Sequence, residues 1–152
     1  MTDQHFEGLR QLTRKEIDEF LSSGRLIAKI ATVRPDGFPY VNPVWYEYDG
    51  KYLYIIERED SADVKHILKN PKVAVCIDRS EPPYTRVIVI GRAEILEGPS
   101  SSLEGEVGKH ALREAVRYLG KDAGERFVER TLKAVRYHLI RIVPKKTNSF
   151  NG

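Results

Sequence analysis

Apolar side chains recur at every second position, or at nearly every position, in several short segments of the chain. Segments with this length and spacing are typical of β-strands that bury one or both faces. Turn-forming residues, mainly Pro, Gly, Asp and Asn, separate the segments from one another. The pattern predicts six strands, over residues 25–33, 38–48, 51–57, 72–78, 84–97 and 137–143.

Other stretches show the three- to four-residue apolar spacing of amphipathic helices. The first begins with a capping box, in which Thr13 and Glu16 satisfy free amides of the first turn. A second helix is capped by Ser61 or Asp60 and ends before Pro71. The predicted helices cover residues 13–24, 61–70 and 103–135, and Gly120 divides the last of them into two.

Short hairpin turns join the first three predicted strands, so we expect these strands to form an antiparallel meander. The turn signals are Pro35-Asp36-Gly37 and Asp49-Gly50. Short amphipathic strands with tight turns favour a small barrel over an open sheet, because closure leaves no unpaired edge. The expected fold is α+β and mainly β, with a short helix after strand three and two helices before the last strand. Residues 1–152 are expected to form a single domain.

Composition excludes several classes of function. No apolar run approaches the roughly 18 residues that span a bilayer, and no signal peptide is evident, so we expect a cytoplasmic protein with no membrane partner. The net charge of +3 is spread along the chain, which does not indicate nucleic-acid binding. The single Cys76 excludes an internal disulfide, and the four histidines lack metal-binding spacing, so no metal site is expected.

The segment at residues 38–48 is unusual for a strand. It contains Pro39 and Pro43, which cannot donate to a β-ladder, together with the only tryptophan of the chain, Trp45. A strand of this kind belongs at a sheet edge, at a bulge or beside a ligand. Gly91 similarly indicates a bulge or a close approach within the fifth predicted strand.

Polar and basic residues near the predicted strand ends suggest an anion site. The free amides and positive dipole end of the helix that begins near Ser61 suit a phosphate group, and Arg58, Lys65 and Arg86 could add charged hydrogen bonds. The alternative is a solvated rim with surface ion pairs. The chain lacks the G-x-G-x-x-G and G-x-x-x-x-G-K phosphate loops and the G-x-S-x-G elbow.

An ordered set of motifs over residues 30–95 resembles the pyridoxamine 5'-phosphate oxidase-like superfamily of split-barrel flavoproteins. The motifs are ATVRPDGFPYVNPVWY, a strand followed by a Ser-led helix, NPKVA, and PPY with R-V-x-V-x-G-x-A. The resemblance implies a six-stranded antiparallel split β-barrel. It also implies a homodimer that binds FMN in the groove between its subunits.

Carried over onto this sequence, the resemblance implies a cofactor-binding set. Two strands would contact the flavin ring, the segment that follows the second strand would hold the phosphate, and Phe150 would reach the cofactor across the dimer. The implied residues are Asn42, Pro43, Val44, Trp45, Ile55, Ile56, Glu57, Arg58, Ser61, Lys65, Arg86 and Phe150.

Three positions depart from the family pattern. Asp63 stands where many members carry a phosphate-binding lysine, and Asn42 and Glu47 stand where the vitamin-processing enzymes carry Arg and Lys. True pyridoxamine phosphate oxidase activity is therefore not expected. The leading hypothesis is a dimeric FMN-dependent oxidoreductase that acts on a small-molecule substrate by hydride transfer.

Two alternatives remain open at this point. The same motifs allow a deazaflavin cofactor, and Asp63 favours a non-catalytic flavin or ligand carrier, or a dimer without a cofactor. No side chain is assigned to catalysis. Tyr46, Tyr84 and His66 are the candidates for proton transfer.

Overall fold

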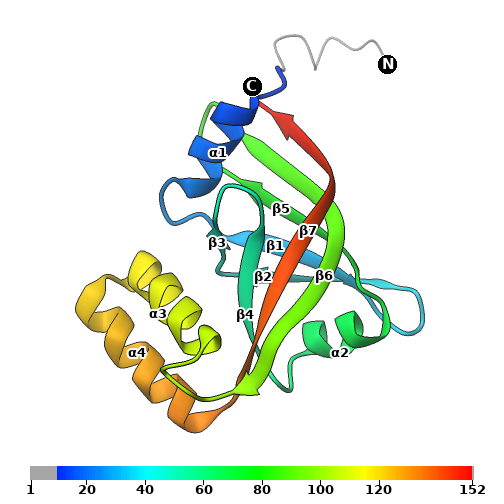
Figure 1. Ribbon diagram of the computed structural model, residues 1–152. Coiled ribbons are helices and arrows are strands. Elements are labelled where there is room, and N and C mark those ends of the chain that lie inside the picture. The colour runs from blue at the N-terminus through cyan, green and yellow to red at the C-terminus, as the bar shows by residue number, and fades with distance from the viewer. Residues whose placement is uncertain (1–9, 152) are drawn as a thin grey trace.

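A computed structural model describes residues 10–151, and Figure 1 shows their arrangement. One curved sheet is flanked by helices. The helices are α1 (Arg14–Ser22), α2 (Ala62–Lys69), α3 (Glu106–Leu119) and α4 (Lys121–Ala134). The strands are β1 (Ala28–Val33), β2 (Pro39–Val44), β3 (Glu47–Tyr48), β4 (Leu53–Arg58), β5 (Lys72–Asp78), β6 (Arg86–Ser100) and β7 (Tyr137–Phe150).

The sheet has seven strands in the order β2-β1-β5-β6-β7-β4-β3, and its two ends do not pair with each other. The predictions of six strands and of a closed barrel are therefore wrong. Both antiparallel pairings of the predicted meander are present, but they are made by the two separate parts of its middle strand. The predicted strand over residues 38–48 divides at Trp45-Tyr46 into β2, which pairs with β1, and β3, which pairs with β4. Consecutive strands thus lie at opposite edges, and the edge position expected for the proline-containing strand is confirmed for β2.

The two long strands β6 and β7 run side by side across the whole sheet (Figure 1). Their register shifts at Gly91, where a Cβ atom would lie 2.1 Å from the Val143 carbonyl oxygen, so the close approach predicted for this glycine is confirmed. Pro144 lies opposite Gly91 at this irregularity. The prediction that Pro144 ends the last strand is wrong, because a proline is tolerated at a bulge and β7 continues to Phe150.

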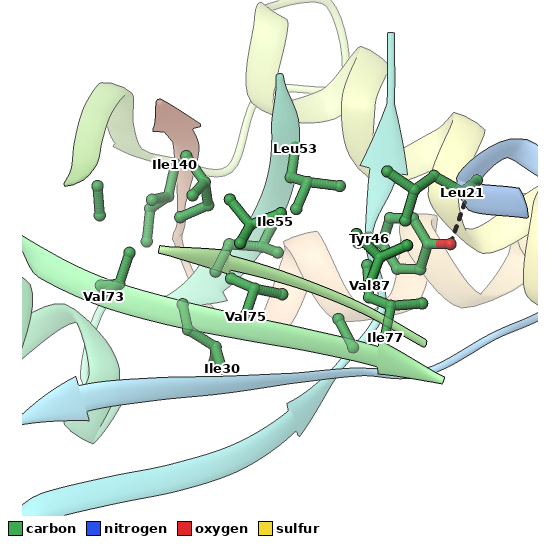
Figure 2. Packing of buried hydrophobic residues seen from close by; sticks show 14 of the residues in the cluster. Leu21, Ile30, Tyr46, Leu53, Ile55, Val73, Val75, Ile77, Val87 and Ile140 are labelled. Carbon is green, nitrogen blue, oxygen red and sulfur yellow. Dashed lines mark hydrogen bonds between the residues drawn. The ribbon is translucent and has the colours of Figure 1, made fainter. Parts of the chain in front are cut away.

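The main core lies on the concave face of the sheet, where alternate positions of five strands meet α1 and α2. Figure 2 shows these side chains packed against one another, with the Tyr46 hydroxyl reaching the Leu21 backbone. Every second residue of β4 and β5 is buried, as period-two patterning requires. The largest buried side chains of this core include Leu21, Ile30, Tyr46, Leu53, Ile55, Ile77 and Ile140.

The predicted helices are confirmed, with boundaries shifted by a few residues. Thr13 and Glu16 form the capping box of α1, and the Ser61 hydroxyl accepts a hydrogen bond from the Val64 amide to cap α2. Gly120, at a φ of 87°, separates α3 from α4. These two helices pack as a hairpin over the outer face of β4 and β7 and enclose a second apolar cluster (Figure 1). In residues 10–151, no helix is long and apolar enough to cross a membrane.

Candidate functional site

A cavity of about 520 Å³ lies between the edge strand β2, the end of β4 and the α3–α4 hairpin. It opens beside β2, which is one of the two edge strands of the sheet. Most of its lining is apolar. The lining residues are Ile27, Asn42, Pro43, Val44, Trp45, Ile56, Glu57, Arg58, Ala111, Phe127, Val128, Thr131, Leu132 and Tyr137.

Aromatic side chains form one wall of this cavity. The Trp45 indole stacks on the Tyr118 ring, with centroids 4.9 Å apart and an interplanar angle of 4°. Phe127, from α4, also contacts Trp45, with ring centroids 5.4 Å apart and an interplanar angle of 50°. Stacked aromatic rings give a rigid, flat surface that suits a planar ligand.

The Trp45 wall is held in place by an arginine that belongs to α3. The Arg117 guanidinium donates hydrogen bonds to the backbone carbonyls of Tyr46 at 3.0 Å and Leu21 at 3.3 Å, and it lies 4.6 Å from the Tyr46 ring centroid. The Tyr46 hydroxyl donates to the Leu21 carbonyl at 2.7 Å, and the Tyr118 hydroxyl donates to the Leu26 carbonyl at 2.6 Å. We call Arg117, Tyr46 and Tyr118 the arginine cluster.

A buried acidic pair lies at the opposite end of the cavity. Glu57 lines the cavity and is 6% exposed, and Asp63, in the first turn of α2, is 1% exposed. Asp63 and Ser61 both lie near enough to the Glu57 carboxyl group to influence its protonation. Burial, followed by the charge of Asp63, raises the pKa of Glu57 to about 8.

Further polar side chains connect this acidic pair to α2 and β1. The Asn42 amide donates to an Asp63 carboxylate oxygen at 2.9 Å, and the Thr32 hydroxyl lies 3.5 Å from the other. Thr32 is also 2.8 Å from Nδ1 of His66, which is itself buried. We call Glu57, Asp63, Asn42, Thr32 and His66 the acid-pair network.

Two further glutamates lie where α3 packs on the sheet. Burial alone would raise the pKa of Glu47, but hydrogen bonds from His110 at 2.8 Å and Arg113 at 2.7 Å outweigh it and lower that pKa. Glu114 is buried, and burial raises its pKa well above the ordinary value, with the charges of Glu47 and Glu57 adding to the effect. Burial therefore favours the neutral form of Glu114, whereas the hydrogen bonds favour the charged form of Glu47.

The cavity brings together seven of the residues that the sequence singled out for the cofactor. These are Asn42, Pro43, Val44, Trp45, Ile56, Glu57 and Arg58. The other five lie elsewhere: Ile55 is in the main core, Ser61 caps α2, and Lys65 is exposed on that helix. Arg86 and Phe150 face each other on β6 and β7, with the guanidinium 4.9 Å from the ring centroid, and neither lines the cavity.

The candidates for proton transfer lie in three different places. Tyr46 is fully buried in the arginine cluster, Tyr84 is 54% exposed in the loop before β6, and His66 is bonded to Thr32. None of the three lines the cavity. Sequence reasoning missed the contributions of α4 and β7, namely Phe127, Val128, Thr131, Leu132 and Tyr137.

Arg58 and Lys65, which the sequence suggested for an anion site, are both exposed in the structure. Arg58 forms an ion pair with Asp60 at 3.1 Å, and both side chains are more than half exposed. Asp63, which stands in the usual lysine position, points inward to Asn42 rather than out to solvent. Within residues 10–151, no three or more His, Cys, Asp or Glu side chains are arranged to hold a metal ion.

Comparison with known proteins identifies the family. The family model for pyridoxamine 5'-phosphate oxidase matches residues 13–143. The chain belongs to this family. No curated protein sequence matches the chain.

Solved structures of family-like proteins share the fold. A conserved hypothetical protein from Mycobacterium tuberculosis matches with a TM-score of 0.72 and 24% identity, over 92% of this chain and 85% of that chain. A FAD-binding protein from Mesorhizobium loti matches with a TM-score of 0.64 and 21% identity, over 94% and 96% of the two chains. An F420 reductase matches with a TM-score of 0.63 and 25% identity, over 84% of this chain and 92% of that chain.

Proposed function

We propose that this member of the pyridoxamine 5'-phosphate oxidase family binds a flavin in the cavity between β2, β4 and the α3–α4 hairpin. The observation that carries the proposal is the aromatic lining formed by Trp45 and Phe127, in which Trp45 is stacked on Tyr118, beside the strand segment that contains Asn42 and Pro43. Pro43 lacks an amide donor, so no backbone donor at this position is lost when a ring lies alongside.

The size and polarity of the cavity fit a flavin ring. A volume of about 520 Å³ falls within the range of roughly 300–1,000 Å³ that small-molecule sites occupy. Ile56, Phe127 and Leu132 give most of the lining an apolar character, and Asn42 and Glu57 supply polar groups at one end. This combination, apolar walls with few polar groups, is typical of sites for planar heterocycles.

The phosphate of FMN is proposed to lie near the N-terminus of α2. Arg58 is at the rim of the cavity, and its exposed pair with Asp60 can open at low free-energy cost because both groups are solvated. The helix dipole at Ser61 favours an anion, and Lys65 is free to approach from the surface of α2. Asp63 is held inward by Asn42, which keeps its carboxylate off the surface that would meet the phosphate.

A homodimer is part of the proposal. The edge strand β2 and its turn expose Phe38 and Val41, which are 68% and 62% accessible. Exposed apolar side chains along an unpaired strand edge suit burial against a second subunit. The cavity opens beside this edge, so a second copy would complete its outer side.

The activity proposed is that of an FMN-dependent oxidoreductase acting on a small molecule. A bound flavin supplies the hydride chemistry, whereas the protein orients the ring, excludes water and sets the local charge. In this chain Trp45 and Phe127 would orient the ring, and the α3–α4 hairpin would shield it from water. Activity on pyridoxamine phosphate itself is not proposed.

Titration of the purified protein with FMN tests the proposal. We expect stoichiometric binding, measured by the change in flavin absorption and fluorescence, and a dimer in analytical ultracentrifugation. Arg58→Ala and Lys65→Ala should weaken FMN binding about tenfold each, whereas Arg141→Ala, a control at an arginine that pairs with Glu94 and does not line the cavity, should leave it unchanged. Protein that neither contains nor takes up any flavin would falsify the proposed function.

F420, a deazaflavin, is the second candidate cofactor. The observation that favours it is the 25% identity with an F420 reductase over 84% of this chain. Parallel titrations of one preparation with FMN and F420 decide between the two by their dissociation constants. Turnover with NADH or NADPH then separates an oxidoreductase from a flavin carrier, which would bind the flavin without consuming either reductant.

A further inference from the structure

Two short segments outside the strands carry lining residues of the cavity. One is the link between β2 and β3, in which Trp45 lines the cavity and Tyr46 follows it. The other lies just before β1, where Ile27 lines the cavity and Leu26 precedes it. Because neither segment belongs to a strand, its backbone needs other hydrogen-bond partners to hold one conformation.

The Tyr118 hydroxyl joins these two segments. It accepts a hydrogen bond from the Tyr46 amide at 3.3 Å and donates one to the Leu26 carbonyl at 2.6 Å. A phenolic hydroxyl has one proton to donate and lone pairs to accept, so both bonds form at the same time. One oxygen atom on α3 therefore fixes the backbone next to Trp45 and the backbone next to Ile27.

The Tyr118 ring also acts on Trp45 directly. The two rings are nearly parallel, with an interplanar angle of 4° and centroids 4.9 Å apart. Tyr118 is 7% exposed and does not line the cavity, whereas Trp45 does. Stacking restricts the orientations that are open to the indole, so Tyr118 can influence a ligand through Trp45 without touching it.

The helix that carries Tyr118 is itself firmly placed. Gly124 of α4 lies so close to the backbone of α3 that a Cβ atom would be 2.7 Å from the Val116 amide nitrogen. Packing this tight leaves little room for α3 to shift against α4. Arg117, the neighbour of Tyr118, donates to the Tyr46 carbonyl at 3.0 Å. The amide and the carbonyl of Tyr46 are thus bonded to adjacent side chains of one well-packed helix.

Building on the flavin-binding function proposed above, we propose that Tyr118 is a positioning residue that holds Trp45 and Ile27 in the arrangement that receives the ligand ring. It stacks on Trp45 and joins the backbones next to both lining residues. Fixing these two side chains in the free protein reduces the conformational entropy that is lost on binding, so Tyr118 raises affinity by preorganisation.

Riboflavin is the probe for this proposal, because it carries the flavin ring without the phosphate proposed to lie near Arg58. Its dissociation constant is measured by flavin fluorescence. Tyr118→Leu removes the ring and the hydroxyl, and it should weaken binding about tenfold or more because two lining side chains must then be ordered by the ligand. Tyr118→Phe keeps the stacked ring and loses only the hydroxyl, and it should weaken binding by about threefold. Equal affinities of Tyr118→Leu and the unmodified protein overturn the proposal. If Tyr118→Leu does not fold, an unchanged affinity in Tyr118→Phe overturns it.

Val107→Ala is the matched control. Val107 is a buried residue of α3 that belongs to the second apolar cluster and does not line the cavity. Its truncation also weakens the packing of α3, but it should leave the riboflavin dissociation constant within about twofold. All variants are compared at a temperature at which circular dichroism shows that each is folded. A loss of affinity in Val107→Ala equal to that in Tyr118→Leu overturns the proposal, because general loosening of α3 would then explain both.

Spectroscopy of the ligand-free protein keeps the two proposals separate. Trp45 is the only tryptophan of the chain, so tryptophan fluorescence and near-ultraviolet circular dichroism report on this one side chain. Tyr118→Leu should lower the fluorescence anisotropy of Trp45 and weaken its circular dichroism band, and Val107→Ala should change neither. Unchanged Trp45 signals in Tyr118→Leu overturn the positioning role, whether or not a flavin binds. An unmodified protein that binds no flavin overturns the flavin function and the ligand class together, while the positioning of Trp45 is judged by these signals alone.

Discussion

Two sets of polar side chains, the arginine cluster and the acid-pair network, lie near the same cavity. They differ in the kind of charge they contain. The arginine cluster is centred on one guanidinium that is charged at every pH a protein survives, and its acceptors are backbone carbonyls. Burial keeps its two tyrosines neutral and raises the pKa of Tyr118 to about 12. The acid-pair network contains two buried carboxyl groups, and burial together with the charge of Asp63 raises the pKa of Glu57 to about 8.

The difference separates two roles for buried polarity. In the arginine cluster each donor has a fixed acceptor and no group changes its charge between pH 5 and pH 9, so the cluster can fasten α3 to the sheet under all ordinary conditions. In the acid-pair network, Glu57 changes its charge within that range, and Asn42 and Glu57 line the cavity. The arginine cluster is suited to stabilising the fold, and the acid-pair network is suited to discriminating between ligands.

The largest expected effect is on the arginine cluster. Arg117→Met should lower the free energy of unfolding by about 3 kcal/mol, because the carbonyls of Tyr46 and Leu21 lose a charged donor in a partly buried site. Urea unfolding at pH 5, 7 and 9 should give the same loss at each pH. Arg113→Met is the control, since that exposed partner of Glu47 should cost less than about 1 kcal/mol. Equal losses for the two variants would contradict the anchoring role of Arg117.

A pH-dependent effect is expected for the acid pair. The unfolded chain releases the Glu57 proton near pH 4.5, whereas the folded protein retains it to about pH 8. The folded state therefore binds more protons between these values, and its stability falls as pH rises through this window, by up to about 1.4 kcal/mol per pH unit. Glu57→Gln should remove this contribution and be about 2 kcal/mol more stabilising, relative to the unmodified protein, at pH 6.5 than at pH 5. Parallel pH profiles for the two proteins in urea unfolding would contradict the raised pKa of Glu57.

A smaller effect is expected for the hydroxyl that joins the acid-pair network. Thr32→Val keeps the shape of the side chain but removes the hydrogen bond to His66 and the contact with Asp63. Leaving the buried His66 nitrogen without its partner should cost about 1.5 kcal/mol in thermal or urea unfolding. A neutral outcome would mean that water replaces the hydroxyl there.

The smallest effect is expected for Tyr46→Phe. The Leu21 carbonyl would lose the Tyr46 hydroxyl at 2.7 Å but would keep the Arg117 guanidinium at 3.3 Å. The expected loss is about 1 kcal/mol, independent of pH. A loss as large as that of Arg117→Met would show that the tyrosine, not the arginine, is the main support of the cluster.

Local sequence signals predicted the elements better than their arrangement. Capping at Thr13 and Ser61, the bulge at Gly91 and the helix break at Gly120 each follow from backbone or hydrogen-bonding chemistry within a few residues. The division of residues 38–48 between two sheet edges does not follow from local chemistry. It depends on which strands β2 and β3 pair with. The continuation of β7 beyond Pro144 likewise depends on Gly91, some fifty residues earlier in the chain.

The candidate site was predictable on its strand side and not on its helix side. Asn42 and Glu57 are polar residues of types depleted in strands, and Trp45 is the only tryptophan of the chain; all three line the cavity. Phe127 and Leu132 follow an ordinary amphipathic period, which shows that they face something apolar without showing what that is. The sequence also did not predict that Asp63 lies near Glu57. Asp63 was interpreted only as a substitution of the lysine that binds the phosphate in other family members.

The link of Trp45 and Tyr46 between β2 and β3 has a consequence for the width of the cavity. Three virtual bonds of about 3.8 Å separate the Cα atoms of Val44 and Glu47, so those atoms cannot lie farther apart than about 11 Å. Because β2 and β3 occupy opposite edges of the sheet, this tether sets an upper limit on how far the edges can separate beside the cavity. The thickness of ligand that this protein admits is thus limited by covalent chain length as well as by side-chain size. Inserting residues between Val44 and Glu47 would relax that limit without altering a single lining residue.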